Sequence, residues 1–329
     1  MVRFFTAGES HGQSLVIIIE GVPAGLSISE DYIGVHLGRR QKGYGRGGRM
    51  LIEQDRAKII SGVRHGHTLG SPIGMTLENK DWANWEEAMA VDPLDGPPES
   101  PRTRRITRLR PGHADLPGAM KYGFEDVRNV LERASARETA GRVAAGAIAI
   151  KLLEEFGIQI HSHVLSIGTV HASAPENIDW AAVEESPVRC ADPDAALKMA
   201  AAIDAAKEAG DTIGGTCEII AENVPIGLGS HVSWDRKIDA QVAQALMSIN
   251  AVKAVSIGPG WEIADQLGSQ VQDVILPVTD PDHPWQRATN KLGGTEGGMT
   301  NGMPLASIVK ISILAEYTLL CLNAKNYYN

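Results

Sequence analysis

Apolar and polar positions divide the first part of the chain into short strands and one amphipathic helix. Residues 14–20 (SLVIIIE) form a continuous apolar run, which predicts a strand buried on both faces. Ser29 precedes a helical pattern that continues to about Arg40, and a serine at that place can cap the helix. Ile33 and Leu37 share one face of this helix. Two further strands are expected near 57–63 and 72–78.

The strongest helix signal begins at Ser135. The stretch Ser135-Ala136-Arg137-Glu138 matches the S-x-x-E capping box, and an Ala-rich pattern continues to Phe156, with Gly157 as the expected end. Residues 80–118 are rich in Pro, Asp and Arg, and they predict a long irregular loop of the kind that is usually functional or disordered. The second half predicts strands at 158–171 and 212–223, and helices at 194–209 and 236–249.

One internal echo bears on domain organisation. LVIIIEGVPAGL at 15–26 resembles CEIIAENVPIGL at 217–228, and each stretch is a predicted strand followed by Val-Pro-x-Gly-Leu. Two related halves would explain the echo, and coincidence would explain it equally well. The alternation of strands and helices predicts an α/β fold.

Composition and charge narrow the class of protein. The 329 residues are 43% apolar and 22% charged, as in an ordinary globular protein of one large unit or two domains. A net charge of −9 argues against a general nucleic-acid binder. No apolar run approaches the roughly 20 residues that span a membrane, and no signal peptide is recognisable, so a cytoplasmic location is expected. Cys190, Cys217 and Cys321 lack metal-ligand spacing and are expected to be reduced, buried thiols.

Two histidines lie in loops whose composition suits proton transfer. His11 stands in Gly8-Glu9-Ser10-His11-Gly12, directly before the first buried strand, where it could act as a general acid. A histidine that is merely satisfied by the loop backbone is the alternative. His113 follows Arg108 and Arg110, which could hold a carboxylate or a phosphate. The alternative here is an exposed, solvated loop.

Three further segments could bind an anion. The Gly-rich loop 39–49 concentrates five cations, which suits an anionic small ligand; an RGG-type RNA segment or a solvated loop are the alternatives. Arg133-Ala134-Ser135 opens the long helix and could bind phosphate, although the capping box explains Ser135 without a ligand. The Gly-rich stretch 293–302 suits a flat or phosphorylated ligand, or a flexible turn. The residues alone therefore predict a cytosolic enzyme with one or two histidine acids that acts on a small polyanion.

Taken together, these segments resemble the chorismate synthase family, and they occur in the family's order. The matching stretches are GESHGQSLVIIIEGVPAG (8–25), RRQKGYGRGGRM (39–50), RPGHADLPGAMKYG (110–123), ERASARETAGRVAAGAIA (132–149), SINAVKAVSIG (248–258) and GGTEGGMTNGMP (293–304). The resemblance implies a β-α-β sandwich with helices between two sheets, and a homotetramer. It implies a lyase of the shikimate pathway that converts 5-enolpyruvylshikimate 3-phosphate to chorismate and phosphate by 1,4-anti elimination, with reduced FMN and no net redox change.

The resemblance also implies roles for particular residues. His11 would protonate the reduced flavin and His113 the departing phosphate, with Ser10 and Ser135 in support. Arg49 and Arg110 match substrate-side arginines. The positions that match FMN contacts are Arg133, Ala134, Ser135, Asn250, Ala251 and Gly297. Arg40 and Arg46 match positions assigned to NADP(H), which matters where the enzyme reduces its own flavin; otherwise a separate flavin reductase is implied.

The resemblance stops after Met303-Pro304. The family continues with a Lys-Pro segment and with a later motif that carries a catalytic Asp and a flavin-binding Arg, whereas this chain has LASIVKISILAEYTLLCLNAKNYYN. We therefore expect a chorismate synthase-like single domain over 1–305 and a divergent or frameshifted tail over 306–329. The same difference predicts little activity for this chain. The alternative to a working lyase is a non-catalytic remnant or binding protein of the same fold.

Overall fold

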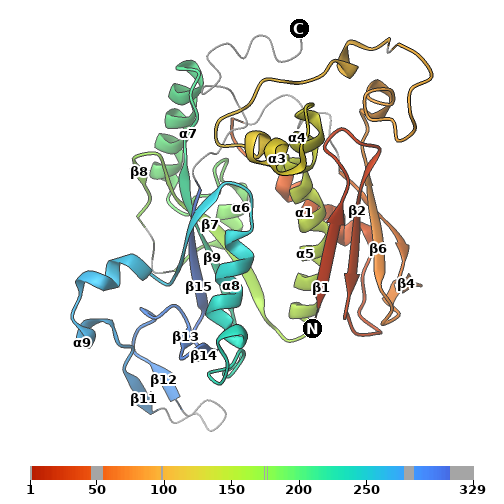
Figure 1. Cartoon of the computed structure of the whole chain (residues 1–329). Coiled ribbons are helices and arrows are strands. Elements are labelled where there is room, and N and C mark those ends of the chain that lie inside the picture. The colour runs from red at the N-terminus through yellow and green to blue at the C-terminus, as the bar shows by residue number, and fades with distance from the viewer. Residues whose placement is uncertain are drawn as a thin grey trace. The chain divides into compact units, whose positions relative to one another are not determined.

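The computed structural model of the chain describes residues 2–45, 55–97, 99–173, 175, 177–277 and 285–311. It divides into two compact units, the first mainly before Leu152 and the second mainly after Leu153 (Figure 1). Within the described residues, no helix is both long and apolar enough to cross a membrane. Both units combine an antiparallel sheet with helices, so the α/β class is confirmed. The boundary expected at 305/306 stays a prediction, and residues 312–329 lie outside the described part.

The first unit is built on a four-stranded antiparallel sheet in the order β1-β2-β6-β3. Its elements are β1 (Arg3–Ala7), β2 (Ser14–Glu20), α1 (Glu30–Gln41), β3 (Ala57–Ser61), β4 (Val63–Arg64), β5 (His67–Thr68), β6 (Ile73–Glu78), η1 (Trp82–Asn84), η2 (Pro101–Thr103), α3 (Asp115–Tyr122), α4 (Arg128–Ala134), η3 (Ala136–Glu138) and α5 (Thr139–Glu154). Helices α1 and α5 supply Ile33, Leu37 and Ile148 to the same core as the sheet residue Ile17. Alanines on α5 allow this close packing, because small side chains bring the helix backbone near the sheet.

Two sequence expectations need correction in the first unit. Strand β2 has the predicted bounds, but Ile18 is 46% exposed while Ile17 and Ile19 are buried, so only one face is covered in the chain. The long helix begins with the short turn η3, and Ser135 accepts a hydrogen bond from the Arg137 amide as an N-cap should. The Glu138 carboxylate accepts hydrogen bonds from Thr6 and Arg142, which leaves the second half of the predicted capping box unformed.

The second unit contains a five-stranded antiparallel sheet in the order β10-β15-β9-β7-β8. Its elements are β7 (Gln159–Ile167), β8 (Val170–His171), α6 (Trp180–Glu185), α7 (Pro193–Glu208), β9 (Gly215–Glu222), η4 (Trp234–Arg236), α8 (Ile238–Met247), β10 (Val252–Ile257), η5 (Gly260–Asp265), α9 (Gly268–Val271), β11 (Ile275–Pro277), β12 (Trp285–Arg287), β13 (Thr295–Glu296), β14 (Met299–Thr300) and β15 (Leu305–Ile311). Met199 of α7 packs in a second core with Ile167 of β7. Cys190 is a buried free thiol, as expected, whereas Cys217 is free but only partly buried; Cys321 lies outside the described residues.

The internal echo corresponds to a shared architecture. Strands β7, β9, β15 and β10 are neighbours in the same order as β1, β2, β6 and β3. The two echoing stretches cover β2 and β9, and each is followed by a turn that bonds to a short hairpin, β4–β5 in the first unit and β13–β14 in the second. The structure therefore favours two related halves over coincidence.

Candidate functional site

The loop that carries Ser10 and His11 is bound to the end of helix α4 in the first unit. The amide of buried Ser10 donates to the backbone carbonyl of Glu132 at 3.0 Å. The Arg133 guanidinium donates to the carbonyl oxygens of Gly8 at 3.2 Å and Thr6 at 2.7 Å. Glu132 is 121 residues from His11. The fold thus brings together two of the segments that the sequence singled out separately.

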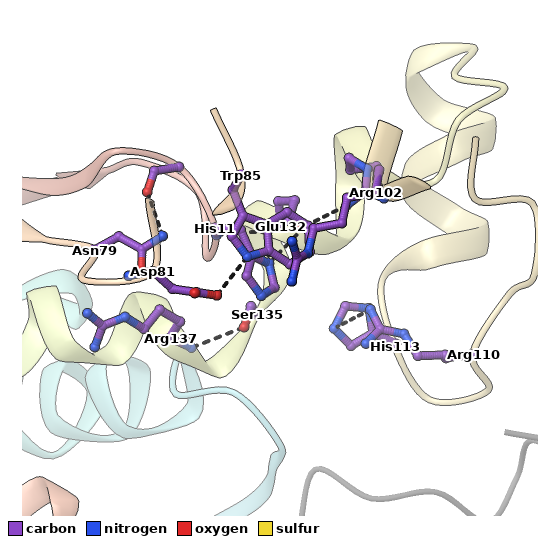
Figure 2. Close-up of polar contacts among 12 residues, drawn as sticks. His11, Asn79, Asp81, Trp85, Arg102, Arg110, His113, Glu132, Ser135 and Arg137 are labelled. Carbon is purple, nitrogen blue, oxygen red and sulfur yellow. Dashed lines mark hydrogen bonds and ion pairs between the residues drawn. The ribbon is translucent and has the colours of Figure 1, made fainter. Parts of the chain in front are cut away.

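His11 is held by side chains from two other segments (Figure 2). Its Nδ1 lies 2.8 Å from Oε2 of Glu132, whose carboxylate is almost fully buried. The indole of Trp85 stacks on the imidazole, with ring centroids 3.8 Å apart, and its Nε1 donates to Asp81 at 2.8 Å. Nδ1 of this ring is therefore bound by a carboxylate from α4, a partner that the alternative of a ring satisfied by loop backbone did not include.

Ser135 follows α4 and lies in the same view as His11 (Figure 2). Its hydroxyl accepts from the Arg137 amide at 3.2 Å, and the Arg137 guanidinium donates to Asp55 at 2.6 Å. Arg40 donates to Thr139 and to the carbonyl of Ala136, each at 3.2 Å. Arg40 therefore ties the end of α1 to the start of α5, and its expected contact with NADP(H) stays a prediction.

His113 forms a second cluster, separate from that of His11 in Figure 2. Its Nδ1 lies 2.5 Å from Oδ1 of Asp115, and the Arg110 guanidinium reaches Oδ2 of the same carboxylate at 2.9 Å. Asp115 is fully buried, while the side chain of His113 is 25% exposed. Burial acts to raise the pKa of Asp115, but hydrogen bonds from His113 and Arg110 outweigh it and hold that pKa well below its usual range. Arg110, His113 and Asp115 therefore form an ionic cluster within a segment whose other residues are exposed, as the alternative of a solvated loop also expects.

The remaining described positions belong to the second unit. Asn250 and Ala251 follow the end of α8, and Ala251 has a φ of +66°, which is uncommon for a residue with a side chain. Gly297 is at the tip of the β13–β14 hairpin, where an added Cβ would meet open space. The neighbouring carbonyl of Gly298 accepts the Ile238 amide at the start of α8. The two stretches thus lie at opposite ends of a ten-residue helix, about 15 Å of rise.

Some site residues were missed by the sequence analysis, and others lie outside the described part. Arg46 and Arg49 fall in the undescribed range 46–54. Glu132, Trp85 and Asp115 were given no role, although each binds one of the two histidines. Asp115 lies in the motif RPGHADLPGAMKYG, two residues after His113, and Glu132 opens the motif ERASARETAGRVAAGAIA. A carboxylate within a family motif was therefore the signal from which a role could have been predicted. Trp85 lies in the irregular stretch 80–118, and no periodicity marks it.

The comparisons with known proteins agree on one family. The family model "Chorismate synthase" matches residues 2–315. The chorismate synthase of Geobacillus thermodenitrificans is 55% identical over 311 residues, covering 92% of this chain and 78% of that protein. That of Bacillus subtilis is 55% identical over 308 residues, with the same coverage of 92% and 78%.

A solved structure titled "Crystal Structure of Chorismate Synthase" also matches, with a TM-score of 0.79 and 42% identity over 95% of this chain and 84% of that one. This likeness confirms the expected chorismate synthase-like fold. The family model covers far more than half of the chain, and the relatives are well above 30% identical over most of their length. The two histidine clusters lie in segments that this match includes. The chain belongs to the chorismate synthase family.

Proposed function

We propose that His11 and His113 are the two acids of the family's reaction in this chain, which removes phosphate from 5-enolpyruvylshikimate 3-phosphate to give chorismate. The observation that carries the proposal is the joining of the 8–12 loop to residues 132–135, which surrounds His11 with motif residues from a distant segment. Two titratable rings held by buried carboxylates in one unit suit proton transfer at two different atoms.

His113 is assigned to the departing phosphate. In the elimination, the bond between carbon and the phosphate oxygen breaks, a proton leaves the ring carbon, and a new double bond forms. Phosphate leaves more easily when it accepts a proton as the bond breaks. The ring of His113 is partly exposed, and Arg110 beside it supplies positive charge for the same oxygen atoms.

Arg110 and Arg49 are assigned to the substrate anions. The substrate carries a phosphate and two carboxylates, and guanidinium groups bind such oxygens in pairs. Arg110 keeps one edge on Asp115, at 2.9 and 3.1 Å, which fixes the direction of its side chain. Arg49 lies outside the described residues, so its assignment rests on the motif alone.

The residues that match FMN contacts of the family by motif are Arg133, Ala134, Ser135, Asn250, Ala251 and Gly297. The open space at Gly297 and the left-handed backbone of Ala251 fit a group that approaches main chain closely. When bound in its reduced form, FMN supplies electron density for the elimination without net redox change. His11, supported by Ser10 and Ser135, would hold the proton beside it. We extend the proposal to a homotetramer in the cytoplasm, and light scattering of the purified chain tests the number of subunits. Binding of NADP(H) and the need for a separate flavin reductase stay predictions.

The test is an anaerobic assay of the purified chain. Reduced FMN and 5-enolpyruvylshikimate 3-phosphate are added, and chorismate absorbance and released phosphate are followed together. Equal amounts of both products would support the proposal, and loss of both in His113→Ala would support the assignment. Full turnover in His11→Ala or His113→Ala would remove the assignments. The same assay measures whether this chain forms chorismate only slowly, as the sequence predicts. Binding of substrate without any turnover would favour the alternative of a non-catalytic protein of the same fold.

A further inference from the structure

Glu132 is the most heavily engaged carboxylate around His11. It is 2% exposed, and its Oε2 accepts both from the His11 amide at 3.0 Å and from Nδ1 of the same residue at 2.8 Å. Arg128, one helical turn earlier, lies 3.4 Å from Oε1. Two of these three neighbours, the His11 amide and the Arg128 guanidinium, can only donate, so both oxygens of Glu132 act as acceptors.

The contacts of Glu132 decide which ring nitrogen of His11 carries a proton. Its Oε2 already accepts from the His11 amide and acts as an acceptor toward the ring as well, so Nδ1 of His11 is the donor of the 2.8 Å contact. With Nδ1–H committed to Glu132, proton gain and loss occur at Nε2. The carboxylate therefore selects the tautomer of His11 as well as the direction of its ring.

Trp85 fixes the ring in the remaining direction. It is 5% exposed and stacks on the imidazole with an angle of 24° between the planes. Arg102 and Arg128 lie over the indole at 5.2 and 5.5 Å from its centroid. In Figure 2, Trp85 and Glu132 flank His11, and Asp81 holds the indole nitrogen. Glu132 thus acts in the plane of the ring and Trp85 across it.

We propose that Glu132 is a positioning residue that holds His11 in the Nδ1–H form and presents Nε2 as the single site of proton exchange. This inference rests on the proposed role of His11 as an acid. His113 shows a related arrangement, because its Nδ1 also lies against a buried carboxylate, that of Asp115. It differs in that the Arg110 guanidinium contacts the same nitrogen at 3.0 Å, so the argument for a fixed tautomer applies to His11.

The test uses the full chain labelled with ¹⁵N-histidine, without flavin. Nitrogen shifts distinguish the two neutral tautomers, and we expect His11 to be in the Nδ1–H form. Glu132→Gln should abolish that single form, giving a mixture or the reversed tautomer. Glu125→Gln removes the same charge from a side chain that is 79% exposed, so it serves as the matched control and should leave the signal of His11 unchanged. An unchanged His11 signal in Glu132→Gln would overturn the proposal.

A kinetic arm separates positioning from folding. In a version of the chain completed with the family's C-terminal segment, Glu132→Gln should lower kcat about 10- to 100-fold with little change in KM. This is a part of the ~10²–10⁴-fold that a general acid supplies. If Glu132→Gln does not fold, Glu132→Asp takes its place, because it keeps the carboxylate but withdraws it from the ring by one methylene. We then expect partial loss of the Nδ1–H form of His11. Full retention of that form would overturn the proposal. Full turnover in His11→Ala would defeat the function of His11 while the tautomer result still decides the role of Glu132.

Discussion

Thr68 and Thr300 make the same set of hydrogen bonds in the two units. The hydroxyl of Thr68 accepts the Leu26 amide at 3.0 Å and donates to the carbonyl of Pro23 at 2.6 Å. The hydroxyl of Thr300 accepts the Leu228 amide at 2.9 Å and donates to the carbonyl of Pro225 at 2.6 Å. Each threonine thus fastens a Val-Pro-x-Gly-Leu turn to its hairpin.

This relationship predicts that the two hydroxyls stabilise their units alike. Thr68→Val keeps the volume but leaves the buried Leu26 amide without its acceptor, at a cost of about 1–3 kcal/mol in the free energy of unfolding. Thr300→Val should cost about the same, again ~1–3 kcal/mol. Urea unfolding followed by circular dichroism measures both. Thr68→Ser, which keeps the hydroxyl, should lose less, and equal midpoints for valine and wild type would contradict the prediction.

The lowered pKa of Asp115 predicts that the free energy of unfolding falls in acid. Because its folded-state pKa lies below its unfolded value, it contributes stability that is present above the unfolded pKa, about 4, and that is lost as pH falls toward the folded value. Urea midpoints should therefore drop between pH 5 and pH 3 more steeply in the wild type than in Asp115→Asn. Asp31→Asn, at a side chain 85% exposed, is the control and should follow the wild type. Parallel curves for wild type and Asp115→Asn would refute the role of the cluster.

The proposed role of His113 as an acid predicts that its substitution affects kcat much more than KM. Its proton transfer to phosphate develops in the transition state, so in a version of the enzyme completed with the family's C-terminal segment His113→Ala should lower kcat by about 10²–10⁴-fold and change KM far less. His113→Gln can still accept and donate hydrogen bonds but cannot exchange the proton, so it should be equally slow. Steady-state kinetics with reduced FMN measures both variants. A large rise in KM with unchanged kcat would show that His113 binds substrate and does not act as an acid.

The arginines predict salt-sensitive substrate binding. At an ionic strength of 0.1 M the screening length is about 10 Å, so an anion held by guanidinium groups in a partly open site binds more weakly as salt rises. Affinity for 5-enolpyruvylshikimate 3-phosphate, measured by calorimetry, should fall markedly with salt, and Arg110→Gln and Arg49→Ala should reduce both the affinity and its salt dependence. Arg56→Gln, a side chain 79% exposed in a pair with Asp31, is the control and should behave as the wild type. Salt-independent affinity would exclude the ionic site.

The local pattern of residue types was sufficient to predict the position of many helices and strands. The apolar run gave β2 its bounds, Ser29 caps α1, and Gly157 follows α5 with the left-handed φ of +74° that a glycine tolerates. These features depend on neighbours within a few residues, which is why periodicity and capping rules describe them. The motifs identified the family for a related reason, since residue types at fixed spacing are read directly from the chain.

Only the tertiary structure decided which partners the chemical groups have. His11 meets Glu132 and Trp85 from distant segments, and no spacing rule connects residues 121 apart. The position of β15 between β10 and β9 likewise depends on long-range pairing of backbone groups. Ile18 lies in an apolar run yet is exposed, because the face of the strand that is buried depends on where the helices pack. Sequence determined the elements and the family of this protein, whereas tertiary packing decided the partners and the direction of its histidines, because the groups that surround a ring in space come from segments far apart along the chain.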